Sequence, residues 1–333
     1  MTKNIMINGF GRIGRNFFRA AYNNPDIDIK YINDLFDAKY LAYSLKYDTV
    51  FGRFPGTVDY KEGALIINGK ELPVTAERDP ASLPHTDYGV EAALESTGFF
   101  INRDGAAKHL QAGAKKVVIS APATNPDITV VLGCNDDKLK DDHQIISNAS
   151  CTTNCLAPVV KVLNDNFGIE KGIITTIHSY TGNQKTVDTA VAGSPIKMTR
   201  GRAAAANIIP TSTGAAKAIG EVFPELNGKL DGMAMRVPTA DGSVVDGKFI
   251  LNKEASIEEI NAAMKKAAEG ALKGILEYSD DPIVSSDVVG NPASSIFSSI
   301  FTNTIGNLCS VLSWYDNEWG YSNRLVDLIA KKL

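Results

Sequence analysis

Residues 3–14 read Lys-Asn-Ile-Met-Ile-Asn-Gly-Phe-Gly-Arg-Ile-Gly, and this stretch decides the fold. Its apolar start is typical of a buried strand, and its three glycines have the spacing Gly-x-Gly-x-x-Gly before a helical pattern. Such a turn lets the backbone approach a pyrophosphate, and the helix start offers unpaired N–H groups. The next expected strand, residues 27–33, ends beside Asp34, where an acid can bind a ribose hydroxyl. We predict a dinucleotide site; an ordinary tight turn with a solvated Asp34 is the alternative.

Around this turn, the first 149 residues alternate short apolar strands with helical segments. The pattern predicts a parallel sheet covered on both faces. A hairpin interrupts it at residues 56–75, where Asn68-Gly69 is typical of a two-residue turn. The expected strands are residues 3–8, 27–33, 91–95, 116–120 and 129–132, and the expected helices are 12–22, 38–47 and 106–112.

From residue 150 the pattern changes to one long helix, ending at Gly168, and then to long strands. Their apolar residues alternate, which favours a mostly antiparallel sheet with one covered face. Ser256 and Glu259 form a capping-box pattern for a helix through Leu272. The expected strands are residues 172–181, 230–238, 242–252, 294–303 and 309–316.

These patterns together predict an α/β fold class. A Rossmann-type doubly wound parallel sheet is followed by a second α+β domain with a mostly antiparallel sheet. We place the dinucleotide-binding domain at residues 1–149 and the catalytic domain at 150–317. The C-terminal helix, about 318–333, is expected to pack back on the first domain.

Composition restricts the class of partner. The chain has 333 residues, 44% hydrophobic and 22% charged, with a net charge of −4, so we expect neither nucleic acid nor a membrane as the primary partner. No apolar run is long enough to span a bilayer, and no charged segment precedes an apolar leader. Four cysteines without a Cys-x-x-Cys pair predict no disulfide framework and no metal site. We therefore expect a cytoplasmic protein with reduced thiols.

Two residues stand out as a candidate catalytic pair. Cys151 begins a predicted helix directly after a strand, where the helix dipole favours the thiolate. His178 interrupts the apolar strand 173–177, where a neutral imidazole needs a partner. A packed thiol and a satisfied core histidine are the alternatives. If the two side chains meet, they form a nucleophile and its base.

The remaining cysteines and histidines are expected to have ordinary roles. Cys134, Cys155 and Cys309 lie in apolar sequence and are expected to be packed. The other three histidines are expected to be solvated: His85, His109 and His143.

Two further segments are candidate anion sites. Residues 210–216 form a hydroxyl- and glycine-rich helix entry, suited to phosphate, although plain N-capping would explain one threonine. Arg236 lies inside the apolar strand 232–238, where a guanidinium needs a carboxylate or a phosphate. A structural salt bridge is the alternative for Arg236.

With these motifs in place, the chain resembles phosphorylating glyceraldehyde-3-phosphate dehydrogenases from residue 3 to the C-terminus. The most specific match is Ser-Asn-Ala-Ser-Cys-Thr-Thr-Asn-Cys-Leu-Ala-Pro at residues 147–158. The matching segments are residues 8–15, 46–48, 95–98, 147–158, 178–181, 208–217, 232–239 and 314–321.

The resemblance implies oxidation of glyceraldehyde 3-phosphate with NAD and inorganic phosphate to 1,3-bisphosphoglycerate, through a hemithioacetal and a thioester on Cys151, with His178 as the base. It also implies a homotetramer. The implied cofactor-binding residues are Gly9, Phe10, Gly11, Arg12, Ile13, Gly14, Asp34, Arg78, Ser120 and Asn317. The implied binders of the substrate phosphate are Thr181 and Arg236, and those of the attacking phosphate are Ser150, Thr152, Thr213 and Gly214, with Arg200 as a helper.

Several positions depart from the family pattern. The segment 188–202 is a few residues longer than usual and carries Thr189-Ala190 in place of Leu-Pro or Gly-Pro, which bears on cofactor contacts. Phe51 and Asn183 also replace usual residues. Strict alternation along the strand places His178 and Thr181 on opposite faces, so one site for both requires a bend after His178.

Two other functions compete with this interpretation. Oxidation of erythrose 4-phosphate by a close relative is one, and the Thr213-Gly214 pair at a phosphate site argues against it. A non-catalytic binding protein on the same fold is the other, and the Cys151–His178 pair argues against that.

Overall fold

The computed structural model describes residues 2–333 and divides into two compact units. The first unit contains the described residues up to Val130, together with Asp137–Ala149 and Ser322–Leu333, and the second contains Val131–Asp136 and Ser150–Tyr321. The last helix, α8 (Trp319–Lys332), thus belongs to the first unit from Ser322 onward. No helix among residues 2–333 is both long enough and apolar enough to cross a membrane.

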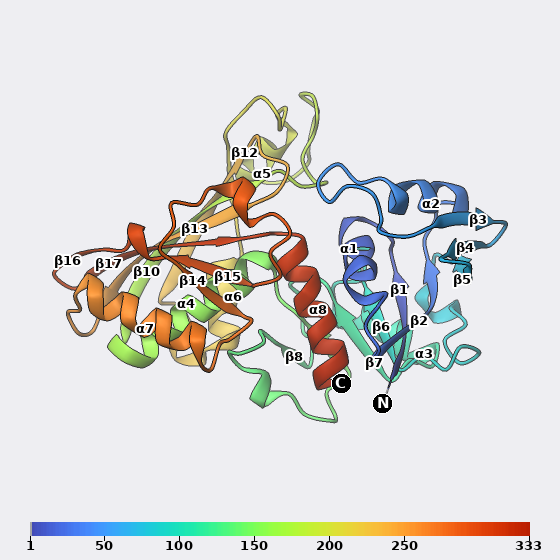
Figure 1. The fold of residues 1–333 in the computed structure, drawn as a ribbon, viewed down its shortest axis with the longest axis horizontal. Helices are drawn as coiled ribbons and strands as arrows, with labels where there is room; N and C mark the ends of the chain where they lie inside the picture. The colour runs from blue at the N-terminus through green and yellow to red at the C-terminus, as the bar shows by residue number, and fades with distance from the viewer. Residues whose placement is uncertain (1) are drawn as a thin grey trace. The chain divides into compact units, whose positions relative to one another are not determined.

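The first unit is built on one sheet whose described strands run in the order β3-β4-β5-β2-β1-β6-β7-β9-β8 (Figure 1). All pairs from β5 to β8 along this order are parallel, and β3, β4 and β5 form an antiparallel meander. The parallel sheet predicted from the sequence is therefore confirmed. The strands are β1 (Lys3–Asn8), β2 (Ile27–Asn33), β3 (Val58–Lys61), β4 (Ala64–Ile67), β5 (Lys70–Thr75), β6 (Ala92–Glu95), β7 (Lys116–Ile119), β8 (Ile128–Thr129) and β9 (Ile145–Ser147).

The carboxyl ends of the central strands meet at one edge of this sheet. Asn8, at the end of β1, is in register with Asn33 at the end of β2 and with Glu95 at the end of β6. The chain leaves β1 toward β2 on one side and returns to β6 on the other. This edge is therefore the switch point at which open α/β sheets bind ligands.

Three helices of the first unit begin close to where the sequence places them. They are α1 (Arg12–Ala21), α2 (Ala38–Lys46) and α3 (Arg103–Gln111). The carboxylate of Asp37 caps α2 and the amide oxygen of Asn102 caps α3, each satisfying a backbone N–H that the helix leaves unpaired. The sequence did not predict β9, and the expected strand 129–132 ends at Thr129.

In the described part of the second unit, the sheet has the order β11-β12-β10-β13-β17-β15-β14, with β16 paired to β17. Most pairs are antiparallel, which confirms the prediction, but β10–β12 and β14–β15 are parallel. The strands are β10 (Ile169–Ser179), β11 (Ile209–Ser212), β12 (Leu230–Val237), β13 (Ser243–Leu251), β14 (Leu276–Ser279), β15 (Ser295–Ser298), β16 (Asn303–Ile305) and β17 (Leu308–Tyr315).

Helix α4 (Cys151–Phe167) packs on this sheet through β13, β15 and β17. It ends at Gly168, whose φ of 69° is a conformation that favours glycine. Helices α6 (Ala215–Val222) and α7 (Ile257–Glu269) pack against α4, and α7 starts with the predicted capping box at Ser256. The helix α7 stops three residues before the predicted end.

One predicted strand of the second unit is wrong. Residues 294–303 do not form one strand, because a 3-10 turn at Ser299–Phe301 separates β15 from β16. The side-chain hydroxyl of Ser299 binds the carbonyl oxygen of Ser279 at 3.0 Å, at the end of β14. The apolar residues of this segment come in two pairs, Ile296-Phe297 and Ile300-Phe301, and the second pair repeats the first across the turn. The sequence therefore gave no sign that the strand stops between them.

Candidate active site and cofactor site

The glycines of the first turn leave room for a ligand's phosphates on one side only. A Cβ on Gly9, whose φ is +90°, would lie 2.7 Å from the backbone nitrogen of Thr97, and one on Gly14 would lie 2.1 Å from the carbonyl oxygen of Gly9. A Cβ on Gly11 would meet nothing within 4 Å. The first and third glycines therefore allow close packing, and the second faces open space, as backbone approach to a pyrophosphate requires.

Asp34 is held beside this turn by two backbone N–H groups. One carboxylate oxygen accepts a hydrogen bond from the N–H of Phe10 at 2.7 Å, and the other accepts one from Phe36 at 3.1 Å. Each oxygen keeps a second lone pair for a ribose hydroxyl. The side chains that follow, Leu35 and Phe36, are apolar and exposed.

In the second unit, Cys151 and His178 come together as predicted. Ser150 caps α4 by accepting a hydrogen bond from the N–H of Thr153, which places Cys151 on the first turn of the helix. The thiol Sγ lies 3.6 Å from Nε2 of His178, near the end of β10. The second ring nitrogen, Nδ1, lies 2.7 Å from the carbonyl oxygen of Ser179.

The Ser179 carbonyl at 2.7 Å favours a proton on Nδ1 of His178. With the proton on Nδ1, the ring donates to this carbonyl, which can only accept, and Nε2 keeps its lone pair toward the thiol. The Nη1 group of Arg236 lies 2.9 Å from both Nδ1 and this carbonyl, and it donates to the carbonyl. The ring is thus oriented as a base for Cys151.

The electrostatics of the pair differ from the sequence-based expectation. Burial raises the pKa of the Cys151 thiol, and the positive charge of Arg236 only partly opposes this. Burial, together with the charge of Arg236, lowers the pKa of His178 to about 3. The resting pair is therefore a thiol and a neutral imidazole, and the helix start alone does not ionise Cys151.

Arg236 joins this pair because β10 and β12 are parallel and in register. His178 lies directly opposite Arg236 in the sheet. Strand β10 ends at Ser179, so Thr181 is free of the strand alternation, and its hydroxyl lies 3.4 Å from Nη1 of Arg236. The buried Nε of Arg236 has no hydrogen-bond partner among the described residues. A guanidinium in this state is suited to a phosphate.

A second group of donors surrounds the start of α6. Gly214 precedes this helix, and a Cβ on it would meet nothing within 4 Å. The hydroxyl of Thr213 accepts a hydrogen bond from Ala215 N–H at 3.2 Å. Arg200 donates to the Thr211 hydroxyl at 2.9 Å and to the Ser212 carbonyl at 3.1 Å. Burial lowers the pKa of Arg236, and the positive charge of Arg200 adds to this effect. Arg200 and the start of α6 thus provide donors for a second anion, apart from Arg236.

Comparison with known proteins agrees with this geometry. Residues 3–103 match the family model of the NAD binding domain of glyceraldehyde 3-phosphate dehydrogenase, and residues 150–317 match its C-terminal domain. The glyceraldehyde-3-phosphate dehydrogenase 1 of Bacillus cereus is 58% identical over 99% of this chain and 98% of its own. That of Bacillus subtilis is 57% identical over 100% and 99%, and the enzyme of Geobacillus stearothermophilus is 57% identical over 99% and 98%.

The chain belongs to the glyceraldehyde-3-phosphate dehydrogenase family. It is an NAD-dependent oxidoreductase, and NAD is its cofactor. Among residues 2–333 no group of three or more potential ligands could hold a metal ion.

The other expected cofactor residues differ in their burial and in their contacts. The Arg12 guanidinium is paired with Asp48 and lies over the ring of Phe51. Ile13 is half-buried in the first turn of α1. Ser120 follows β7 at the carboxyl edge of the sheet, and Arg78 is exposed.

Asn317 of this family member is a strongly constrained side chain of the second unit. Its amide oxygen accepts hydrogen bonds from the hydroxyls of Ser179 and Ser243, both at 2.6 Å. The amide nitrogen is therefore the group that can donate to a ligand. Ser179 therefore contacts both residues, since its hydroxyl donates to Asn317 and its carbonyl lies 2.7 Å from Nδ1 of His178.

Sequence reasoning missed one residue beside the pair. The Tyr315 hydroxyl lies 2.9 Å from the hydroxyls of both Thr152 and Thr176, and its ring stands edge-on to His178 at 5.9 Å. The alternation of β17 could have indicated that Tyr315 faces inward with Val311. Thr152, an expected phosphate binder, is buried and holds Tyr315.

The expectation of solvated histidines is wrong for two of the three. His85 and His109 are both 0% exposed, while His143 is half-exposed in its loop. Helix α3 turns His109 toward the sheet, where other polar side chains satisfy it. Local sequence around both residues is polar, so it gave no sign of their burial.

Proposed function

We propose that the chain oxidises D-glyceraldehyde 3-phosphate to 1,3-bisphosphoglycerate, with NAD and inorganic phosphate, as a step of glycolysis and gluconeogenesis. The observation that carries this proposal is the Cys151–His178 pair with Arg236 beside it. Residues 1–149 would form the NAD-binding domain, with the helix of about 318–333, and residues 150–317 the catalytic domain.

In this proposal Cys151 is the nucleophile. Its sulfur forms a bond to the aldehyde carbon as its proton passes to Nε2 of His178 and then to the carbonyl oxygen, which gives a hemithioacetal. His178 next removes the hydroxyl proton as the carbon is oxidised to a thioester. NAD, when bound, supplies the two-electron oxidant. Phosphate then attacks the thioester carbon, and the sulfur leaves, so the acyl phosphate keeps the energy of oxidation.

Two phosphate positions follow from the donors described above. Arg236 and Thr181 would hold the phosphate of the substrate, since Nε of Arg236 is buried without a partner. Thr213 and Gly214 would hold the attacking phosphate at the start of α6, with Arg200 nearby. Ser150 and Thr152 would complete this second position.

The first test is NADH formation from glyceraldehyde 3-phosphate with and without inorganic phosphate. We expect turnover to depend on phosphate, because release of the thioester requires an attacking nucleophile. Erythrose 4-phosphate, assayed in parallel, is expected to be a poor substrate. Equal rates without phosphate, or a preference for erythrose 4-phosphate, would refute the proposal.

The same assay tests cofactor choice, which we assign to Asp34. NADP would bring its 2′-phosphate against this carboxylate, and unit charges 4 Å apart repel by about 4 kcal/mol at an effective dielectric near 20. Even a third of this energy gives about tenfold preference for NAD. We expect Asp34→Ala to lose part of the preference. Equal or better catalytic efficiency with NADP in the unmodified protein would show that the loop of residues 188–202 decides instead.

We also propose that the chain works as a homotetramer in the cytoplasm. The second sheet exposes large apolar side chains, with Ile173 66% and Ile305 74% exposed, and charged side chains such as Lys171 and Lys248 lie beside Ile173. An open groove of about 480 Å³ with Leu308 and Ile250 in its walls continues this surface, and a second copy of the chain is its expected occupant. Four free cysteines support a reducing compartment.

A further inference from the structure

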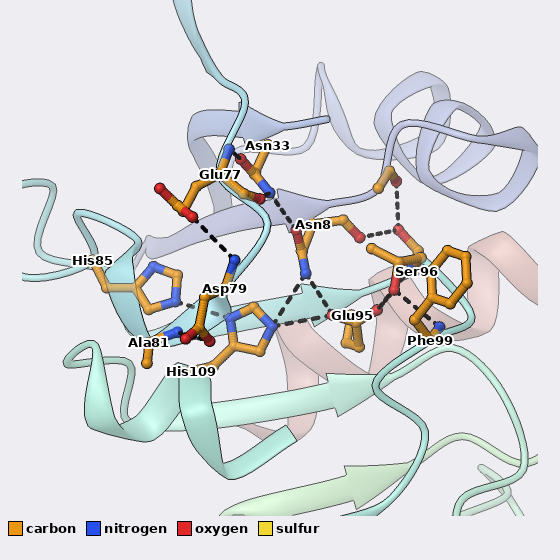
Figure 2. Close-up of polar contacts among 12 residues, drawn as sticks. Asn8, Asn33, Glu77, Asp79, Ala81, His85, Glu95, Ser96, Phe99 and His109 are labelled. Atoms are coloured by element: carbon orange, nitrogen blue, oxygen red, sulfur yellow. Dashed lines mark hydrogen bonds and ion pairs between the residues drawn. The ribbon is translucent and has the colours of Figure 1, made fainter. Parts of the chain in front are cut away.

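A line of buried polar side chains crosses the first unit and ends at the cofactor turn. The Tyr31 hydroxyl lies 2.6 Å from Nδ1 of His85, and Nε2 of His85 lies 2.9 Å from Nδ1 of His109. Nε2 of His109 lies 3.1 Å from Oε2 of Glu95. Figure 2 shows the two rings and the carboxylate pointing toward one another. None of these four residues is more than 1% exposed.

Glu95 connects this line to the loop after β6. Its Oε1 accepts hydrogen bonds from the backbone N–H of Thr97 at 2.8 Å and from the Thr97 hydroxyl. The Thr97 hydroxyl oxygen in turn accepts one from the N–H of Phe99 at 3.1 Å. The backbone of Thr97 is also the atom group that closes against Gly9. A fixed Glu95 therefore fixes the packing of the glycine turn.

Glu95 also connects to the ends of β1 and β2. Its Oε2 accepts a hydrogen bond from the side-chain amide of Asn8 at 2.6 Å, and the Asn8 oxygen accepts one from Asn33 at 2.8 Å. The Asn33 oxygen accepts one from the backbone N–H of Glu77 at 2.8 Å. Asn8 directly precedes Gly9 and Asn33 directly precedes Asp34. One carboxylate thus ties together the three turns that the dinucleotide site uses (Figure 2).

Backbone donors at Glu77 and Thr97 fix the direction of the bonds that run from Asn33 through Asn8 to Glu95. The Glu77 N–H can only donate, so Asn33 must present oxygen to it and an amide nitrogen to Asn8. Asn8 must then donate to Glu95, which leaves both Glu95 oxygens as acceptors. Nε2 of His109 lies 3.1 Å from Oε2 of Glu95 and 3.4 Å from the Asn8 amide nitrogen, which already donates to Glu95 at 2.6 Å. We take the shorter contact, to the carboxylate, as the hydrogen bond, and it requires a proton on Nε2.

The same reasoning runs through both rings to Tyr31. Nδ1 of His109 must accept from Nε2–H of His85, and Nδ1 of His85 must accept from the Tyr31 hydroxyl. The reversed order would leave the buried Tyr31 proton without an acceptor, since His85 is the partner of this hydroxyl among residues 2–333. Burial lowers the pKa of His85 to about 3 and raises that of Tyr31, so both groups stay neutral at pH 7.

We propose that Tyr31, His85 and His109 are positioning residues for NAD. The Tyr31 hydroxyl and the Nε2–H groups of His85 and His109 all donate toward Glu95 and so fix the orientation of its carboxylate. Glu95 in turn fixes the turns at the ends of β1, β2 and β6. This proposal rests on NAD binding by the first unit and not on the roles assigned to Cys151 and His178. These three residues touch neither reacting group, so they act on cofactor affinity and not on the chemical step.

The first test compares two replacements of His109. In His109→Gln the amide nitrogen can donate to Glu95 while the amide oxygen accepts from His85. This keeps the direction of donation along the hydrogen bonds. In His109→Leu neither bond remains. We expect calorimetry to show NAD bound about tenfold more weakly by His109→Leu and within about threefold of the unmodified protein by His109→Gln.

The matched control is His143→Gln, the same replacement at a half-exposed histidine that is not part of this hydrogen-bond network. It is expected to leave NAD affinity unchanged. We expect kcat at saturating NAD to stay within about twofold in all three variants, since the hydrogen-bond network acts on the affinity for NAD. Equal losses in His109→Leu and His109→Gln, or no loss in His109→Leu, would overturn the proposal.

A second measurement needs no variant and no activity. Nitrogen NMR of the full protein with ¹⁵N-labelled histidine reports which ring nitrogen of each histidine carries the proton. From the bond directions we expect both His85 and His109 to carry a proton on Nε2 and none on Nδ1. A proton on Nδ1 of either ring, or a charged ring, would overturn the proposed direction of the hydrogen bonds, even if every variant failed to fold.

Discussion

Replacing His178 with asparagine is expected to lower kcat by about 100- to 10,000-fold, the range typical for loss of a positioned base. The Cys151 thiol is half-buried and its pKa is raised, so it depends on a neighbour to take its proton. Nε2 of His178, at 3.6 Å, is the acceptor in reach. Initial rates at saturating substrate, NAD and phosphate measure this effect.

The same variant should change the reactivity of the thiol. In the unmodified protein, brief iodoacetamide treatment near pH 7 is expected to label Cys151 before Cys134, Cys155 and Cys309, whose pKa values burial also raises. In His178→Asn, labelling of Cys151 should slow and shift to higher pH. A matched control is His143→Asn, outside the site. Equal labelling of Cys151 and Cys134, or a kcat within tenfold of the unmodified value, would contradict the assignment.

Arg236→Leu is expected to lower kcat/KM for glyceraldehyde 3-phosphate by about 10- to 150-fold. A charge-assisted hydrogen bond contributes about 1.5–3 kcal/mol, and a guanidinium whose buried Nε lacks a partner has such a bond to offer. An aldehyde without phosphate should lose much less. The ratio of kcat/KM for the two aldehydes measures the effect and cancels any general loss of folded enzyme.

Thr213→Ala is the matched comparison for the second anion position. It should raise the KM for inorganic phosphate while leaving the KM for glyceraldehyde 3-phosphate nearly unchanged, because its hydroxyl serves the start of α6. Identical losses for both aldehydes in Arg236→Leu would show instead that Arg236 acts through structure, since Nη1 also holds the carbonyl of Ser179.

Much of the fold could be predicted because its signals are local. The run of residues 3–14, the turn at Asn68-Gly69 and the capping box at Ser256 each describe a backbone geometry that nearby side chains dictate. The helix beginning at Cys151 and the lone histidine in β10 pointed to the candidate catalytic pair for the same reason. Local signals failed at the 3-10 turn of Ser299–Phe301, where Ser299 bonds to Ser279, a residue distant in the sequence, and the apolar pair Ile300-Phe301 repeats the pair before it.

The sequence by itself determined the fold class, the order of elements, the dinucleotide turn and the candidate nucleophile and base. The tertiary structure decided what each polar group faces. It paired His178 with Arg236 through a parallel register, raised the pKa of Cys151 by burial, and buried His85 and His109 in a directed chain. The physical reason is that hydrogen-bond partners and solvent exposure depend on residues far apart in the chain, and these become neighbours only when the sheets and helices pack.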